Sequence, residues 1–438
     1  MSELQTGLLI GVVTTLILLT GVPVAFALGL VGVGFLVAFE GWGSLNFTAD
    51  IFFDSLNSFA LLSIPMFIVM GGVVASSRAG PDLYHALDRW LYKVPGGLMV
   101  SNLGACALFA ALSGSSPATC AAIGKLGIPE MRQRGYPASV ATGSVAAGGT
   151  LGILIPPSVT MIVYGIATES SIGRLFLAGL LPGLMLTALF IGWGLIAAKR
   201  GGYSFVDPNL SYTLRQKLVV LPKVLPFLLI IAGILYVLYG GVATPSEAAG
   251  VGALFCIVLV ALIYRVWRPK AFFDVFRDAM RESVMILMII AASELFSYMM
   301  STLFITQTIA ESIAALDVNR WVVMAIINLF LLVAGCFLPP VAIILMTAPT
   351  LLPILQSLDF DPIWFAVILT INMEIGLITP PVGLNLYVIN GITPDVKLPT
   401  ILWGALPFML CMVLAIVILC VFPEIALWLP THMMGAAL

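Results

Sequence analysis

Apolar runs of helix length recur along the chain and are separated by polar segments, which include a connector at 125–137, a polar linker at 199–223 and a basic loop at 265–281. Runs of roughly 17 to 25 residues are long enough to cross a hydrocarbon core about 30 Å thick. Residues 6–39 contain two such runs, which meet at Gly21-Val22-Pro23. Further spans are expected at 58–76, 175–198, 224–240, 245–264, 282–304 and 400–422. The pattern therefore predicts an all-α polytopic membrane protein.

Two other apolar stretches are interrupted near their middle by small residues and proline. Residues 97–124 contain Ser113-Gly-Ser-Ser-Pro-Ala-Thr119, and residues 321–355 contain Gly335-Cys-Phe-Leu-Pro-Pro340. Each flank is about half the length of a membrane span. We therefore predict two re-entrant helical hairpins whose tips reach the middle of the membrane.

A glycine followed by a proline pair interrupts the chain twice, at Gly152-Ile-Leu-Ile-Pro-Pro157 and at Gly376-Leu-Ile-Thr-Pro-Pro381. An interior proline costs a helix roughly 3 kcal/mol. Broken backbone survives in a membrane only inside protein or around a polar cavity. We predict two broken helices that resume at Pro157 and Pro381, because proline suits the first turn of a helix.

Two amphipathic segments accompany the hairpins. Residues 78–93 place Leu83, Leu87 and Trp90 at helical spacing between charged residues, and residues 308–318 repeat the pattern. Such segments are too polar to span a membrane, so we expect helices that lie along its interface.

The order of these features is the same in both halves of the chain. An offset of 224 positions, the difference between 376 and 152, aligns the two glycines and the two proline pairs. The same offset aligns Pro129 with Pro353. The sequence therefore predicts an internal duplication.

The basic residues predict the orientation of the two repeats. With the N-terminus and C-terminus in the periplasm, every Lys and Arg except Arg174 and Arg320 falls on the cytoplasmic side. This arrangement satisfies the positive-inside rule, and the opposite orientation violates it. The first hairpin then enters from the cytoplasm and the second from the other side, so the halves are inverted repeats, as in many secondary transporters.

Composition agrees with a membrane protein and excludes several other classes. The chain has 438 residues, of which 61% are apolar and 9% charged, against about 25% charged in an average soluble domain. A net charge of −2 offers no basic surface for nucleic acid. With only two histidines and no CxxC spacing among six cysteines, we expect no transition-metal site and no enzyme activity.

The breaks and tips supply ligands for ions. The half-helix ends at a break carry about half an elementary charge each, so free amides suit an anion and free carbonyls a cation. Oxygen ligands favour a hard cation, and we expect a sodium ion between each tip and its partner break, with an organic substrate between the two. Candidate sodium ligands in the first half are Ser113, Gly114, Ser115, Ser116, Pro117, Thr119, Gly149, Thr150, Gly152 and Pro156. Those in the second half are Gly335, Pro339, Pro340, Glu374, Gly376, Thr379 and Pro380. Candidate substrate contacts are Ser116, Pro157, Ser158, Pro381 and Asn385.

Glu374 is an acidic residue placed beside a break near the membrane centre. An ionised group there costs at least ~2.5 kcal/mol unless it has a partner. Two interpretations stay open: Glu374 binds a cation or carries a proton, or its carboxylate only holds the break in shape through neighbouring amides.

The motifs as a set resemble the large membrane subunit of TRAP transporters, which are tripartite ATP-independent periplasmic uptake systems. The resemblance is carried by Gly21-Val-Pro23, the 113–119 tip, Gly127-Ile-Pro-Glu-Met-Arg132 and both Gly-x-x-x-Pro-Pro breaks. It implies a sodium-driven elevator in a bacterial or archaeal inner membrane. It also implies two partners, a small four-helix membrane subunit and a periplasmic substrate-binding protein.

In such an elevator the hairpins and broken helices move against a scaffold. The expected units are N-terminal scaffold spans (1–76), an interfacial arm (77–96), the first hairpin and broken helix (97–168), a scaffold span with a cytoplasmic linker (169–223), scaffold spans of the second repeat (224–304), a second arm (305–320), the second hairpin and broken helix (321–394) and a C-terminal span with its tail (395–438).

An alternative within the same superfamily is a stand-alone sodium–dicarboxylate or related anion carrier that needs no binding protein. Uptake of free substrate by this chain alone distinguishes the two. The identity of the substrate does not follow from the sequence.

Overall fold

The computed structural model describes residues 2–202, 212–265, 269–315 and 318–435. Parts of three predicted segments lie outside these ranges, namely 203–211 of the polar linker, 266–268 of the basic loop, and 316–317 at the end of the second amphipathic segment. Every regular element in the described ranges is helical, which confirms the predicted fold class.

The N-terminal part contains a helix at each of the two predicted spans, and it also contains helical structure at 42–56 that the pattern did not predict. The first two helices are α1 (Glu3–Leu19) and α2 (Val24–Glu40), apolar helices of 17 residues each, and the turn between them uses Gly21 at φ +83°. They are followed by η1 (Trp42–Phe47), α3 (Thr48–Leu56), η2 (Phe59–Leu62) and α4 (Ser63–Ala75). The chain bends by 57° between the α3 and α4 regions.

The first hairpin and the first broken helix are present, with helix ends that differ from the prediction. The elements are α5 (Ala79–Leu91), α6 (Gly97–Ser113), α7 (Ser116–Gln133), α8 (Ala138–Gly149), α9 (Leu151–Leu154), α10 (Val159–Ala167) and α11 (Ile172–Gly201). The polar connector expected at 125–137 is helical as far as Gln133, although Pro129 lies inside it. One side of this stretch buries Ile128 and Met131, and that packing overrides local propensity.

The second half repeats this order. Its elements are α12 (Leu214–Leu218), α13 (Leu221–Tyr239), α14 (Pro245–Tyr264), α15 (Pro269–Thr302), α16 (Ile305–Ala314), α17 (Arg320–Gly335), α18 (Pro340–Ser357), α19 (Pro362–Leu377), α20 (Leu384–Ile392), α21 (Leu398–Val421) and α22 (Glu424–Met434). The predicted basic loop at 265–281 is wrong from Pro269 onward, because α15 begins there and continues for 34 residues. Its charged residues lie on exposed helical positions and do not interrupt the helix.

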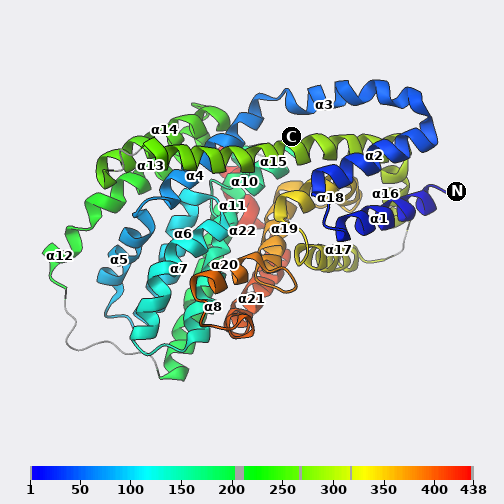
Figure 1. Cartoon of the computed structure of the whole chain (residues 1–438). Helices are drawn as coiled ribbons and strands as arrows, with labels where there is room; N and C mark the ends of the chain where they lie inside the picture. The colour runs from blue at the N-terminus through cyan, green and yellow to red at the C-terminus, as the bar shows by residue number, and fades with distance from the viewer. Residues whose placement is uncertain (1, 203–211, 266–268, 316–317, 436–438) are drawn as a thin grey trace.

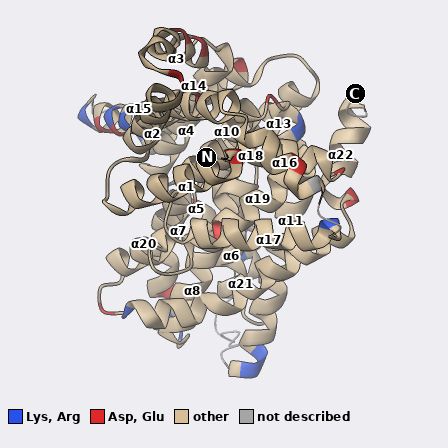
Figure 2. Ribbon diagram, turned by 90° about the vertical axis from the view of Figure 1, so that its right-hand side faces the viewer, with Lys and Arg blue, Asp and Glu red and all other residues tan. Residues whose placement is uncertain are grey.

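Helix α15 runs across the molecule and connects its two ends (Figure 1). It packs on α2, α3, α4 and α18. The hairpin α6–α7 and the helices α8, α11, α19, α20 and α21 form a bundle on one side of it. Six of the described helices are long and apolar enough to cross a membrane, or up to eight if each bent pair counts as one span. Charged residues gather at the ends of the molecule and are sparse between them (Figure 2).

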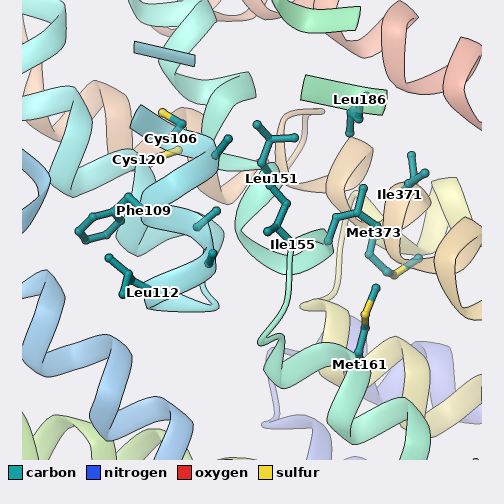
Figure 3. Close-up of a cluster of buried hydrophobic side chains, with 14 of the residues drawn as sticks. Cys106, Phe109, Leu112, Cys120, Leu151, Ile155, Met161, Leu186, Ile371 and Met373 are labelled. Carbon is teal, nitrogen blue, oxygen red and sulfur yellow. The ribbon is translucent and has the colours of Figure 1, made fainter. Parts of the chain in front are cut away.

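The core around the first break joins the two halves of the chain. Figure 3 shows Leu151 and Ile155 beside Ile371 and Met373 of α19, with Phe109 of α6 on the other side. All five side chains are buried. The first break is therefore held inside protein, as broken backbone in a membrane requires, whereas Pro380 and Pro381 of the second break are exposed.

Candidate functional site

The first hairpin tip is a compact network of hydroxyls and carbonyls. Gly114 ends α6 in the left-handed region (φ +58°), and the Ser113 and Thr119 hydroxyl oxygens lie 2.9 Å apart. The Thr119 hydroxyl also donates to the Ser115 carbonyl at 2.9 Å. Ser113 and Thr119 are buried. The tip therefore gathers several oxygen atoms at one point, the donor set that a hard cation prefers.

The first break packs directly against this tip. Gly152 has no room for a side chain, because a Cβ there would lie 2.8 Å from the Ser115 carbonyl oxygen. A Cβ on Gly149 would meet the Cys120 sulfur and the Ser116 carbonyl. The Thr150 hydroxyl donates back to Ala147 of its own helix at 2.5 Å. Tip and break thus meet through backbone atoms.

Both half-helices resume later than predicted. The Pro156–Pro157 and Pro380–Pro381 bonds are cis, and both proline pairs lie in the linking segments. Helix α10 begins at Val159, with the Ser158 hydroxyl accepting a bond from the Met161 amide at 3.3 Å. Helix α20 begins at Leu384, after Gly383 at φ +50°. The prediction that Pro157 and Pro381 occupy the first turn is therefore wrong.

The second tip also contacts its break through backbone atoms, but it is longer and has fewer polar side chains. Gly335 ends α17, and α18 begins at Pro340 after Pro339. A Cβ on Gly376 would collide with the backbone of Gly335, and the Val382 amide donates to the Cys336 carbonyl at 3.1 Å. The second tip is thus joined to its break by backbone contacts, as the first is.

Glu374 reaches the first tip from the second half of the chain. The Ser116 hydroxyl donates to Glu374 Oε1 at 2.6 Å, across a sequence separation of 258 residues. Glu374 is 1% exposed, and its Oε2 makes no hydrogen bond of ordinary geometry among the described residues. The backbone amide of Ile153, at the first break, also interacts with the carboxyl group. The sequence grouped Glu374 with the second tip, whereas the structure places its carboxyl group on the first.

Two other predicted residues hold the second break in place. The Thr379 hydroxyl donates to the Ile375 carbonyl at 2.6 Å and lies 3.3 Å from the Met409 sulfur. The Asn385 amide donates to the Ala146 carbonyl of α8 at 3.3 Å, which connects α20 to the first half of the chain. Asn385 Oδ1 is buried and has no partner among the residues described.

A cavity of about 610 Å³ lies between the two tips. Both tips line it, with residues of α4 and of the first half of α15 forming its other wall. The first residues of α7, α10, α18 and α20 all face it. Among these four helices only α10 has a side-chain cap at its N-terminus, so the first-turn amides of the other three lack a side-chain hydrogen bond.

The α15 wall carries acidic residues that the sequence prediction missed. Asp274, Asp278 and Glu282 line the cavity, and no Lys, Arg or His does so among the described lining residues. These three residues are four positions apart, so they lie on one helical face. The sequence contains this four-residue spacing of acidic residues, but the basic residues between them favour the prediction of a basic loop.

A second cavity of about 1070 Å³ lies beyond the other half of α15. Its lining includes Asp54, Glu169 and Glu294, and it contains no residue of either hairpin tip. Size alone therefore does not identify the site, and the convergence of tips and breaks singles out the smaller cavity.

Comparisons with known proteins identify the family of this chain. Residues 11–425 match the family described as "Tripartite ATP-independent periplasmic transporter, DctM component". The chain is 39% identical over 378 residues to the C4-dicarboxylate TRAP transporter large permease protein DctM of Pseudomonas aeruginosa, covering 86% of this chain and 88% of the relative. It is 30% identical to the sialic acid TRAP transporter large permease protein SiaM of Vibrio cholerae, covering 96% of this chain and 97% of the relative.

The fold is also similar to that of a solved transporter. The Alcanivorax borkumensis YdaH transporter superposes with a TM-score of 0.65 at 14% identity, covering 91% of this chain and 90% of that one. This likeness concerns the fold alone. From the match over nearly its whole length, the chain belongs to the DctM family, the DctM component of tripartite ATP-independent periplasmic transporters.

Proposed function

We propose that this chain carries out sodium-coupled uptake of a small organic anion, delivered by a periplasmic binding protein, through an elevator-type alternating-access mechanism. The observation that supports it best is the cavity between the two hairpin tips, where four helix N-termini meet. Membership of a family of transporter permeases, rather than of an enzyme family, supports transport as the activity.

The anion is expected on the tip side of the cavity. Free amides and positive helix ends attract a carboxylate without a basic side chain. On the α15 wall Asp274 and Asp278 form ion pairs with Arg277 at 3.4 and 3.3 Å, and Glu282 has no ion-pair partner among the described residues. Glu282 therefore repels a carboxylate most strongly, and the polar, uncharged part of the solute is expected to face it. C4-dicarboxylate and sialic acid in the names of the two relatives are both carboxylates, which supports this substrate class.

Sodium is expected at both tips and moves as cargo with the solute. At the first tip the Ser113 and Thr119 hydroxyls and the Ser115 carbonyl offer oxygen ligands. At the second tip Gly335 and Gly376 bring two backbones together, and carbonyl oxygens are the main ligands. Oxygen ligands of this kind suit a hard cation.

The cavity lies where the expected moving part meets the expected scaffold. The hairpin tips form one side, and α4 and α15 form the other. Gly71 of α4 lies so close to the Ser113 carbonyl that it has no room for a side chain. A site at such a boundary suits an elevator, since the tips can carry their ligands along the α4–α15 wall.

Two partners and an orientation complete the proposal. The family is tripartite, which implies a small membrane subunit and a periplasmic binding protein. The chain is a polytopic inner-membrane protein with both termini proposed to lie in the periplasm, because that arrangement keeps most basic residues in the cytoplasm.

Uptake by reconstituted proteoliposomes tests the proposal. The chain, the small subunit and the binding protein are combined, and labelled C4-dicarboxylate and sialic acid are offered with and without an inward sodium gradient. Accumulation is expected only with all components and the gradient. Uptake by this chain without the binding protein would indicate a stand-alone carrier, and uptake indifferent to sodium would contradict the coupling.

A further inference from the structure

We propose that Glu374, a residue of the second repeat, is a ligand of the sodium site at the first hairpin tip. The inference rests on the proposed sodium coupling and deepens it. It assigns the carboxylate to the tip opposite to the one that its place in the sequence suggests. Binding of one ion would then fasten the two repeats to each other.

The contact between Ser116 and Glu374 joins the two repeats at the ion-binding tip. Ser116 begins α7 directly after the tip, and its hydroxyl donates to Glu374 Oε1 at 2.6 Å. Both side chains are essentially inaccessible, at 0% and 1% exposure. A bond this short and buried fixes the carboxyl group beside the tip oxygens.

The second carboxyl oxygen of Glu374 has no cationic partner among the described residues. Glu374 Oε2 is buried and makes no hydrogen bond of ordinary geometry among the described residues, although the Ile153 amide also interacts with the carboxyl group. No described Lys, Arg or His forms an ion pair with Glu374. Burial of an unpaired charge is strongly destabilising, so such a carboxyl group is either neutral or paired with a cation. A sodium ion bound by Oε2 and the tip oxygens supplies that cation.

The equivalent position in the first repeat behaves differently. The offset of 224 aligns Glu374 with Thr150, whose hydroxyl bonds to Ala147 of its own helix. Among the described residues Thr150 makes no side-chain hydrogen bond to the second tip. The proposed sodium sites are therefore unequal: the first has a carboxylate from the other repeat, and the second depends on backbone oxygens.

Sodium-dependent thermal stability measures this ligand without measuring transport. The purified chain, together with its small subunit, is unfolded by heating at increasing sodium, with choline keeping the ionic strength constant. A ligand that binds only the folded protein raises the unfolding midpoint in a saturable manner. Equilibrium binding of ²²Na⁺ to the same samples gives an independent readout.

Glu374→Gln is expected to raise the half-saturating sodium concentration of this stabilisation at least about ten-fold, by analogy with the loss of a metal-site residue. Ser116→Ala is expected to give a smaller increase, and the double variant should not add the two effects, because both residues act at one site. Glu294→Gln is the matched control: it removes another carboxylate of the membrane region, in the larger cavity, and should keep the wild-type response.

The outcomes separate this inference from the proposed function. A Glu374→Gln protein that folds and keeps the wild-type sodium response overturns the inference and leaves sodium coupling intact. A wild-type protein whose stability and ²²Na⁺ binding show no sodium effect overturns the coupling itself. If Glu374→Gln does not fold, Glu374→Asp replaces it, since the shortened carboxylate keeps its charge and should still weaken sodium binding; an unchanged response then also overturns the inference.

Discussion

The two hairpin tips both contact a broken helix through backbone atoms, and they differ in length and in side chains: residues 114–115 separate α6 from α7, and residues 336–339 separate α17 from α18. At each tip a glycine of the broken helix lies against the tip backbone, Gly152 against Ser115 and Gly376 against Gly335. The first tip adds a buried hydroxyl pair. The second has Cys336, whose thiol only donates back to Leu332 of its own helix at 3.2 Å. Duplication has kept the close approach of backbones and has not kept the ligands.

The difference shows which part of the site depends on backbone geometry and which on side chains. The shared part is the contact of broken helix and tip, which positions free amides and carbonyls at the cavity. The variable part is the set of oxygen ligands, and the first tip receives one of these, Glu374, from the other repeat.

Substitutions that disrupt the contact between a broken helix and its tip should have the largest effect on uptake and stability. Gly376→Ala and Gly152→Ala each place a methyl group against backbone that cannot turn away, and overpacking of this kind costs typically ~1–3 kcal/mol. We expect both variants to lose most sodium-driven uptake and to unfold at lower temperature, with Gly376→Ala the more severe because its clash is closer.

Two other helical glycines serve as matched controls. A Cβ on Gly192 of α11 or on Gly391 of α20 meets nothing within 4 Å. Alanine is the better helix former by about 1 kcal/mol, so Gly192→Ala and Gly391→Ala should keep uptake and stability. If Gly376→Ala behaved like these controls, the close approach of break and tip would not matter for transport.

Removing hydroxyl groups should change the sodium dependence of uptake more at the first tip than at the second. Ser113→Ala combined with Thr119→Ala deletes the polar pair of the first tip, and we expect a several-fold higher sodium concentration for half-maximal uptake. Thr379→Ala at the second break removes a hydroxyl that bonds mainly to its own helix, so a smaller change is expected. Equal sodium dependence in both variants would contradict the inequality of the tips.

The smallest effect is expected far from the tips, where an ion pair links the two halves. Arg132 at the end of α7 lies 2.7 Å from Asp395 in the loop before α21, and both side chains are substantially exposed. The hydrogen bond from Arg132 holds the pKa of Asp395 below its ordinary value. Its contribution is therefore present above the ordinary aspartate pKa of about 3.9 and is lost as the pH falls through the lowered value.

Exposed ion pairs contribute little and are screened by salt. Asp395→Asn should consequently lower the unfolding temperature slightly at neutral pH and low salt, and not at high salt. Its sodium dependence of uptake should equal that of the wild type. A marked change in sodium dependence would mean that the link between the repeats at this end also takes part in ion coupling.

Local patterns predicted most of the fold and only part of the site. The hairpins, the breaks and the duplication can be predicted from the sequence because Gly, Pro and Ser interrupt apolar runs. Each interruption affects the backbone of the residues next to it. Local propensity failed where packing decides, as in α7 beyond Lys125 and in α15 from Pro269 onward. Helices α10 and α20 begin later than predicted because each proline pair lies in the segment that links the two half-helices.

The partner of Glu374 could not be predicted from sequence spacing. The order of motifs pairs each tip with the break of its own repeat, and the backbone contacts at Gly152 and Gly376 agree with that pairing. The bond between Ser116 and Glu374 depends on how the two repeats pack against each other. A single sequence with one acidic residue beside a break contains no signal for that choice.

The binding of solute and sodium between the two hairpin tips is tested most directly by electron cryomicroscopy of the transporter with its small subunit, sodium and a bound carboxylate solute. We expect solute density in the cavity between residues 113–118 and 339–341, with the carboxylate of the solute at the helix N-termini and an ion beside Glu374 and Ser116. Solute held instead in the larger cavity lined by Asp54, Glu169 and Glu294, with no contact to either tip, would contradict it.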